Sequence, residues 1–201
     1  MPIEQYDSLR DQRLANLRAG FFPRLPVGAP IILEVGCGHG HYLNAYAAAH
    51  PQEYCVGLDL IGDRIARAER KASRAGLSNL AFVQAEASLF LGALAEQPVP
   101  VLLRRVFVLF SDPWPKRRHW KNRVVQPGLL DLLGKLTEPG AAFHFRTDHP
   151  EYFTFAREVV AAHPQWRLAG EDTVTWPFEY VSVFEERALA GAPQSFTAVR
   201  C

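Results

Sequence analysis

Along the first 160 residues, two kinds of segment alternate: short runs of apolar residues, and segments in which apolar residues recur at helical spacing. Short apolar runs bounded by polar or turn-forming residues predict strands. They lie at residues 31–35, 54–60, 80–84, 101–110 and 141–146. Segments with helical spacing separate them, at residues 40–49, 63–75, 87–95, 126–136 and 150–162. This regular alternation predicts strand–helix units that form a mostly parallel sheet covered on both faces.

The last third of the chain has a different pattern. Residues 166–170, 180–187 and 195–200 have strand character with no helical segment between them, which predicts antiparallel strands. The expected fold class is therefore α/β: a three-layer, Rossmann-like fold with a mostly parallel sheet and an antiparallel C-terminal hairpin. Residues 1–30, polar and then proline-rich, are expected to form an N-terminal arm, and residues 31–201 a single domain.

Composition narrows the class of protein. The chain has 201 residues, of which 48% are hydrophobic and 21% charged, so it can bury a core and is not of the disordered class. No apolar run approaches the ~18 residues that span a bilayer, and residues 1–5 do not begin a secretory signal. We therefore expect a cytoplasmic protein. The three cysteines are too far apart for a disulfide framework or a zinc site.

Charge is distributed unevenly. The formal net charge is only +1, yet residues 104–123 contain seven Lys or Arg against one Asp. A concentrated basic segment on an otherwise mildly acidic chain predicts a local anionic partner.

The loop after the first predicted strand is rich in glycine. Residues 33–40 read Leu-Glu-Val-Gly-Cys-Gly-His-Gly, which allows a tight turn and a close approach of ligand to backbone. His41 stands where a dinucleotide fingerprint needs glycine, and no Gly-Lys-Ser/Thr follows, so neither NAD nor a phosphate loop is expected. The segment resembles the E/D-x-G-x-G-x-G loop of class I S-adenosylmethionine-dependent methyltransferases.

Two acids follow the next strands. Asp59 ends the second predicted strand, where a carboxylate can accept both hydroxyls of a ribose, and Glu86 follows the third, on the expected adenine side. Acids at two successive strand ends strengthen the resemblance that the glycine loop gives.

The fourth strand leads into the most informative segment of the chain. Residues 111–126 read Ser-Asp-Pro-Trp-Pro-Lys-Arg-Arg-His-Trp-Lys-Asn-Arg-Val-Val-Gln. Asp112-Pro113-Trp114 is close to the motif of methyltransferases that act on exocyclic amines. The longer string resembles the bacterial tRNA (guanine-N7-)-methyltransferase family, and residues 77–80, 143–148 and 181–187 continue that resemblance.

The resemblance implies a set of site residues. The implied cofactor contacts are Glu34, Gly36, Gly38, Asp59, Glu86 and Asp112. The implied substrate contacts are Lys116, Asp148, Ser182 and Glu185. Asp112 is also the implied catalytic residue, although N7 of guanine has a free lone pair and needs no general base. At positions 59, 86 and 182 this chain has Asp, Glu and Ser, where typical members of the family have Glu, Asp and Thr.

The basic segment is then expected to bind RNA. Lys116, Arg117, Arg118, Lys121 and Arg123 would neutralise phosphates, while Trp114 and Trp120 would offer stacking faces for a base.

The leading hypothesis is methylation of guanine N7 in tRNA, at position 46 of the variable loop by resemblance. The alternatives are an exocyclic-amine methyltransferase and a non-catalytic RNA-binding relative. The expected cofactor is S-adenosyl-L-methionine and the expected partner is tRNA. No membrane and no obligatory protein partner are expected, and the chain would act as a monomer or homodimer.

Overall fold

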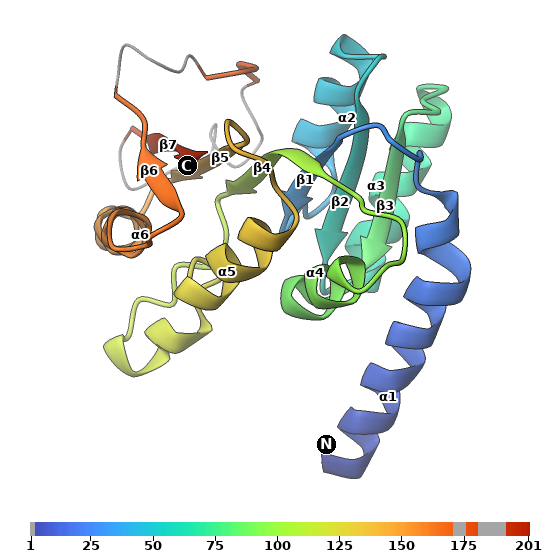
Figure 1. The fold of residues 1–201 in the computed structure, drawn as a ribbon, viewed down its shortest axis with the longest axis horizontal. Helices are drawn as coiled ribbons and strands as arrows, with labels where there is room; N and C mark the ends of the chain where they lie inside the picture. The colour runs from blue at the N-terminus through green and yellow to red at the C-terminus, as the bar shows by residue number, and fades with distance from the viewer. Residues whose placement is uncertain (1–2, 171–175, 181–191) are drawn as a thin grey trace.

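The computed structural model describes residues 3–170, 176–180 and 192–201 (Figure 1). A seven-stranded sheet with the order β3-β2-β1-β4-β5-β7-β6 forms its centre. The strands are β1 (Ile31–Val35), β2 (Tyr54–Asp59), β3 (Leu80–Gln84), β4 (Leu103–Leu109), β5 (Ala142–Thr147), β6 (Trp166–Leu168) and β7 (Gln194–Arg200). Strands β1 to β5 are parallel, whereas β7 runs antiparallel to both β5 and β6. The predicted fold class is confirmed.

The helices agree with the predicted segments to within one residue at each end. They are α2 (His41–Ala49), α3 (Gly62–Arg74), α4 (Ala87–Ala95), α5 (Pro127–Lys135) and α6 (Pro150–Ala161). The expected strand over 180–187 falls almost wholly outside the described residues. None of the described helices is long and apolar enough to cross a membrane.

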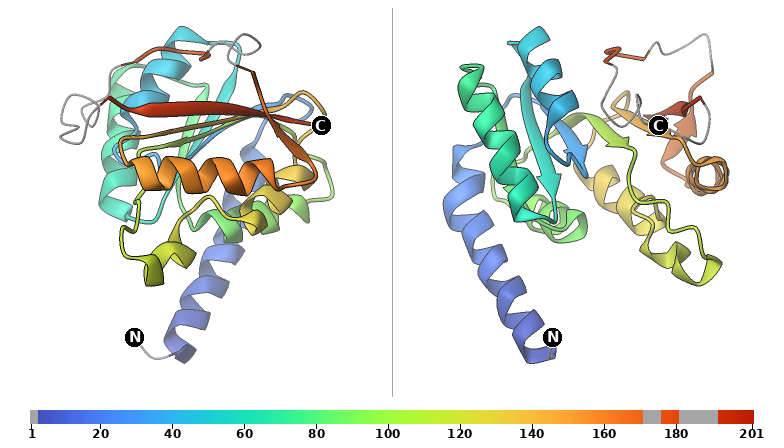
Figure 2. Two further views of the ribbon diagram at one scale, coloured as in Figure 1. Left: turned by 90° about the vertical axis from the view of Figure 1, so that its left-hand side faces the viewer. Right: turned by 180° about the vertical axis from the view of Figure 1, so that it is seen from behind.

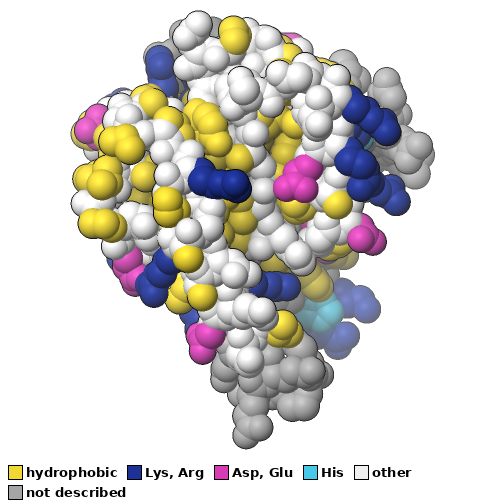
Figure 3. Space-filling view, turned by 90° about the vertical axis from the view of Figure 1, so that its right-hand side faces the viewer, with side chains coloured by type: hydrophobic (Ala, Val, Ile, Leu, Met, Phe, Trp, Pro, Cys, Tyr) yellow, Lys and Arg dark blue, Asp and Glu magenta, His cyan; other side chains and the backbone are white. Residues whose placement is uncertain are grey.

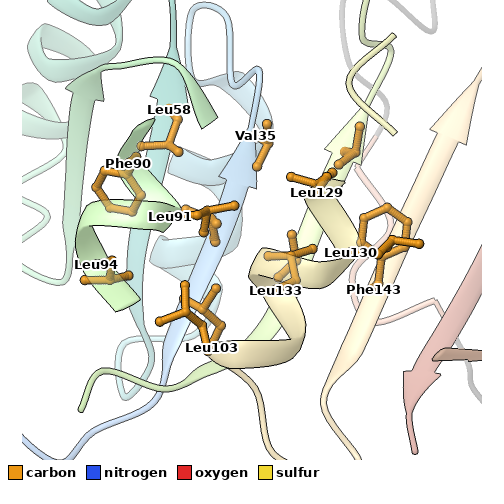
Figure 4. Close-up of a cluster of buried hydrophobic side chains, with 14 of the residues drawn as sticks. Val35, Leu58, Phe90, Leu91, Leu94, Leu103, Leu129, Leu130, Leu133 and Phe143 are labelled. Atoms are coloured by element: carbon orange, nitrogen blue, oxygen red, sulfur yellow. The ribbon is translucent and has the colours of Figure 1, made fainter. Parts of the chain in front are cut away.

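The sheet and the helices on its two faces form three layers. A hydrophobic cluster lies on each face of the sheet, between the sheet and its helices. Along β1, Ile31, Leu33 and Val35 enter the larger cluster, whereas Ile32 enters the other, as the alternation of a strand requires. Figure 4 shows side chains of α4 and α5 on the larger cluster's face, packed against Val35 and other strand residues. Helices α2 and α3 supply the second cluster. Burial on both faces explains why these strands read as continuous apolar runs.

The N-terminal segment contains an unpredicted helix, α1 (Ile3–Asn16), which extends away from the sheet (Figure 2). It leads into a π-helix, η1 (Leu17–Phe21), and a 3₁₀ turn, η2 (Phe22–Arg24). Leu17 and Phe22 are buried in the larger cluster, and the Phe22 ring lies 5.4 Å from that of Phe90 in α4. Residues 17–25 therefore contribute to the core.

The order of strands creates a switch point between β1 and β4. After β1 the chain crosses to β2, and after β4 it crosses to β5 on the other side. The loops that follow β1 and β4 therefore diverge, which opens a crevice at the carboxyl ends of these two neighbouring strands.

Candidate functional site

A pocket of about 240 Å³ lies at this switch point. Its wall includes Glu34, Gly36, Gly38, His41, Phe110 and Asp112. A larger cavity, of about 480 Å³, lies between the segments that precede β1, β4 and β5 at the opposite edge of the sheet. It contains none of the predicted site residues, so the candidate site is the pocket at the carboxyl edge.

The glycine loop is held in a conformation that other residues adopt only under strain. Gly36, Gly38 and Gly40 have φ angles of 78°, 54° and 67°. A Cβ on Gly40 would lie 2.6 Å from the Phe82 ring and 2.7 Å from the Cβ of Ala68, so only glycine fits there. At Gly36 and Gly38 a Cβ would meet no atom within 4 Å, which leaves that side of the loop open to a ligand.

Asp59 fixes this loop from the end of β2. Its buried carboxylate accepts hydrogen bonds of 2.9 Å from the backbone N–H groups of Gly38 and Ile61, and Arg64 lies 3.6 Å from it. A carboxylate has about four acceptor positions, so two of them are engaged by the backbone. Asp59 therefore shapes the loop in addition to the ligand contact predicted for it.

Glu34 is a buried acid in the wall of the pocket. Its side chain is 4% exposed, and Oε2 has no hydrogen-bond partner in the described structure. Burial, with a smaller contribution from the charge of Asp59, raises the pKa of Glu34 to about 8. An unpaired carboxylate in a pocket is strongly favourable for a cationic ligand, because that ligand would supply the missing hydrogen bond and counter-charge.

Asp112 lies at the mouth of the same pocket, between two strained residues. Phe110 and Trp114 have φ angles of 48° and 44°, which are genuine outliers for bulky side chains. The Asp112 carboxylate is exposed, and its Oδ1 accepts a hydrogen bond of 3.2 Å from the N–H of Trp114. Backbone strain on both sides of a polar residue at a pocket is typical of a functional site.

The expectation that Arg123 neutralises phosphate is wrong. Arg123 is 1% exposed, and its Nε donates a hydrogen bond of 2.8 Å to the carbonyl of Pro113. Its guanidinium carbon lies 4.2 Å from the ring centre of Trp120, 4.8 Å from Phe155 and 4.9 Å from Tyr152. Arg123 therefore supports the Asp112 loop from beneath, by cation–π contacts and one backbone hydrogen bond.

Tyr152 and Trp120 complete this support. The Tyr152 hydroxyl accepts hydrogen bonds of 3.3 Å from the Ser111 Oγ and from the N–H of Val125, so it joins the two ends of the loop to α6. The ring of Trp120 is half-buried and packs against Arg123 and Phe155. It was expected to stack on a base, but these two contacts already engage it. Lys116, Arg117, Arg118 and Lys121 remain exposed, in and beside the 3₁₀ helix η3 (Arg117–Asn122).

Comparison with known proteins decides the family. Residues 28–192 match the protein family described as "Putative methyltransferase". The tRNA (guanine-N(7)-)-methyltransferase of Azorhizobium caulinodans is 36% identical over 86% of this chain and 74% of its own length. The chain belongs to the family of these tRNA (guanine-N(7)-)-methyltransferases. The corresponding Rhodospirillum rubrum protein is 33% identical over 90% of this chain and 71% of its own.

A solved structure supports the fold assignment. TrmN from Thermus thermophilus superposes with a TM-score of 0.58 at 17% sequence identity, over 96% of this chain and 48% of that one. At this identity the likeness extends to the fold alone.

The predicted site residues are only partly brought together. Glu34, Gly36, Gly38 and Asp112 line the pocket, and Asp59 lies directly behind its glycine loop. Glu86 is exposed at the start of α4, where its Oε1 accepts a hydrogen bond from the Ser88 hydroxyl, and it does not line the pocket. Lys116 and Asp148 are not in its wall either. Ser182 and Glu185 lie outside the described residues.

Other pocket residues were not among the predicted contacts. They are Cys37, His39, His41, Tyr42, Arg64, Leu109, Phe110, Arg146 and Tyr180. Arg146 stacks on Trp176, with its guanidinium carbon 4.1 Å from the ring centre, and its Nη2 lies 3.4 Å from a Glu179 carboxylate oxygen. The one sequence signal for Arg146 was its position in residues 143–148, which carry the family resemblance. It stands two residues before the predicted substrate contact Asp148.

The methyl donor of this family, S-adenosyl-L-methionine, fits the residues present. Its methionine end carries an ammonium group, which is the partner that the buried Oε2 of Glu34 lacks. The open side of the glycine loop leaves backbone accessible beside it. Glu34, Gly36 and Gly38 would hold the cofactor's methionine end.

The buried acid predicts a pH dependence of cofactor binding. The affinity of the wild-type protein for S-adenosylhomocysteine is expected to rise from pH 6 to 8.5, as the Glu34 carboxyl loses its proton through a pKa of about 8. Glu34→Gln is expected to bind about tenfold or more weakly, with this rise absent. Calorimetric titrations of both proteins across this range measure the effect.

Stability of the unliganded protein gives the control. Because the pKa of folded Glu34 is raised above its ordinary value of 4.5, the carboxyl disfavours folding increasingly as pH rises from 4.5 to about 8. Glu34→Gln is therefore expected to raise Tm more at pH 8 than at pH 5. An equal shift at both pH values would contradict the assignment.

Proposed function

We propose that this protein transfers a methyl group from S-adenosyl-L-methionine to N7 of a guanine in tRNA. The observation that carries the proposal is the pairing of two acids in one pocket: a buried, unpaired Glu34 and an exposed Asp112 on a braced loop. The first suits a cationic cofactor, and the second suits a base presented from outside. Membership of the family supports this substrate and atom.

The reaction requires no proton transfer to or from the protein before the methyl group is transferred. When bound, the cofactor supplies an electrophilic methyl group on a sulfonium. N7 of guanine already has a lone pair in the plane of the ring, so the residues need to position it and to accommodate the positive charge it gains. Asp112 at the pocket mouth is placed to stabilise that charge by its own negative charge. Asp148 or Glu185 would accept hydrogen bonds from N1–H and N2–H₂ on the opposite edge of the guanine. Adenine lacks this pattern of donors, which gives specificity.

Further substrate contacts are proposed for four residues. Lys116 is exposed beside η3, and Asp148 is half-buried in the loop after β5. Both belong to loops at the carboxyl edge of the sheet, on which a tRNA would lie. Family resemblance supports contacts from Ser182 and Glu185.

The four exposed cations of the loop would bind the tRNA backbone, because a base must leave its stack to enter the pocket and its phosphates then lie at the rim. Arg117→Ala with Lys121→Ala is expected to weaken tRNA binding and to lower the slope of log Kd against log salt by roughly 0.7–0.9 per lost phosphate contact. Filter-binding titrations at several salt concentrations measure it. A slope equal to that of the wild type would place the RNA elsewhere.

The test of the function is the identity of the methylated nucleoside. An in vitro tRNA transcript is incubated with the protein and methyl-labelled S-adenosyl-L-methionine, and the digested nucleosides are separated. We expect label in 7-methylguanosine alone. Label in an N²-methylguanosine or a methyladenosine would contradict the proposed acceptor. By family resemblance the guanine is the one at position 46, so a transcript with adenine there should lose the label.

A further inference from the structure

Helix α3 carries a concentration of positive charge that the proposed function does not use. Its thirteen residues include five Lys or Arg and two acids. At 3.6 residues per turn, Arg67, Arg70 and Arg74 project within ~60° of one another around the helix axis. All three are exposed. We call these three residues the α3 basic face.

Within the described part of the chain, no ion pair or hydrogen bond is formed by the side chain of Arg67, Arg70 or Arg74. Asp63, one turn before Arg67, makes no ion pair with it, and Glu69 projects toward a different side of the helix. One acid on this face, Asp63, against three arginines leaves the face with a net positive charge.

The positive potential extends from α3 to the wall of the pocket. Lys71, one residue along from Arg70, donates hydrogen bonds to the carbonyl of His39, at 2.9 Å, and to the His41 ring. His39 and His41 both line the pocket. Burial lowers the pKa of His39, and the nearby charges of Lys71, Arg67 and Arg64 lower it further, whereas Asp59 opposes them. These cations therefore act on the same rim.

The two basic surfaces flank the site from opposite sides. The η3 loop lies next to Asp112, at the β4 side of the pocket, whereas α3 follows β2 and borders the glycine loop. In Figure 1, α3 lies toward the right of the molecule, and the space-filling view of that side shows Lys and Arg side chains gathered at its upper right (Figure 3).

We propose that the α3 basic face binds phosphates of the same RNA whose guanine enters the pocket, as a second electrostatic contact beyond the η3 loop. The inference rests on the proposed function, because it takes the RNA to be the tRNA substrate. Arg67 and Arg74 are two turns, or about 10 Å, apart along the helix, so they can reach separate phosphates. A polyanion that crosses the pocket is the one partner able to contact both basic surfaces while a nucleotide is in the site.

The experiment compares two double variants of equal charge. Arg67→Gln with Arg74→Gln removes two charges from the α3 basic face and leaves Arg64 and Lys71, which contact the glycine loop and its acid, unchanged. Lys135→Gln with Arg167→Gln removes two exposed charges from the end of α5 and from β6, the strand farthest from β3 in the sheet. Binding of a tRNA transcript is measured by filter retention, so the result does not depend on turnover.

The α3 variant is expected to raise the Kd for tRNA on the order of tenfold at moderate salt and to lower the salt slope by roughly 0.7–0.9 per lost contact. The KM for tRNA should rise with it, while kcat, S-adenosylhomocysteine affinity and Tm remain those of the wild type. The control variant should bind as the wild type does.

Two results would overturn the inference. One is an unchanged Kd and salt slope in the α3 variant while the wild type methylates N7; this leaves the proposed function intact and assigns the face to another partner, such as an acidic protein. The other is an equal loss in both variants, which would mean a general effect of net charge. If the wild type instead methylates a different nucleoside, the proposed function fails, whereas selective loss of tRNA binding in the α3 variant still supports the second contact.

Discussion

Replacing Asp112 with alanine is expected to lower kcat for tRNA methylation by about 10²–10³-fold, with the fold and the cofactor affinity retained. The carboxylate is exposed at the pocket mouth, and among the described residues its hydrogen bond is a local one, from the Trp114 N–H. Its loss should therefore change Tm little. Removing it leaves no negative charge beside the N7 that becomes positive.

Asparagine at the same position separates charge from geometry. The amide oxygen of Asp112→Asn can still accept the hydrogen bond from Trp114, so the turn should be kept, while the negative charge is lost. We expect the rate of this variant to lie near that of Asp112→Ala if electrostatic stabilisation dominates, and near the wild type if orientation of the loop dominates. Steady-state kinetics at saturating cofactor measure both. A near-normal rate for Asp112→Ala would remove Asp112 from the mechanism.

Loss of Arg123 is the second large effect. Arg123→Ala is expected to lower the free energy of unfolding by about 3 kcal/mol, because it removes a buried side chain packed between three aromatic rings and its hydrogen bond to the Pro113 carbonyl. The strained Asp112 loop would lose its support, so kcat should also fall, by about tenfold or more. Denaturant unfolding and single-turnover rates measure the two effects.

Arg123→Lys is the matched variant. Lysine keeps the charge and much of the length but lacks the planar guanidinium that stacks on Trp120 and Tyr152. It should fold, with a reduced kcat and an unchanged salt dependence of tRNA binding, because Arg123 supports the loop from within the protein. A salt slope that falls in Arg123→Ala, with kcat unchanged, would show that Arg123 contacts a phosphate.

The predictable and unpredictable parts of the structure differ for physical reasons. The strands from β1 to β5 followed from their apolar runs, since burial on both faces leaves little room for polar residues. The same pattern did not predict α1, whose sequence is polar and lacks an apolar stripe, although Leu17 and Phe22 just beyond it reach the core. The strand proposed over 180–187 lies outside what the structure describes, apart from Tyr180.

Within the site, local sequence identified the glycine loop and Asp112 but not the roles of the surrounding charges. Arg123 and Arg117 look alike in a basic run, yet one is buried and the other exposed. The difference comes from Tyr152 and Phe155, which lie some 30 residues later and meet Arg123 only when α6 packs beside the loop. The unpaired state of Glu34 is likewise a property of the packed pocket and has no local signal.

The central claim is that N7 of guanine receives the methyl group in the pocket formed by Glu34 and Asp112. It is tested most directly with a tRNA transcript in which guanosine is replaced throughout by 7-deazaguanosine, which keeps N1–H and N2–H₂ but has carbon in place of N7. With methyl-labelled S-adenosyl-L-methionine, the ordinary transcript should be labelled, and the substituted one should remain unlabelled while competing for the enzyme. Label on the substituted transcript would contradict the account, because the acceptor would then be another atom.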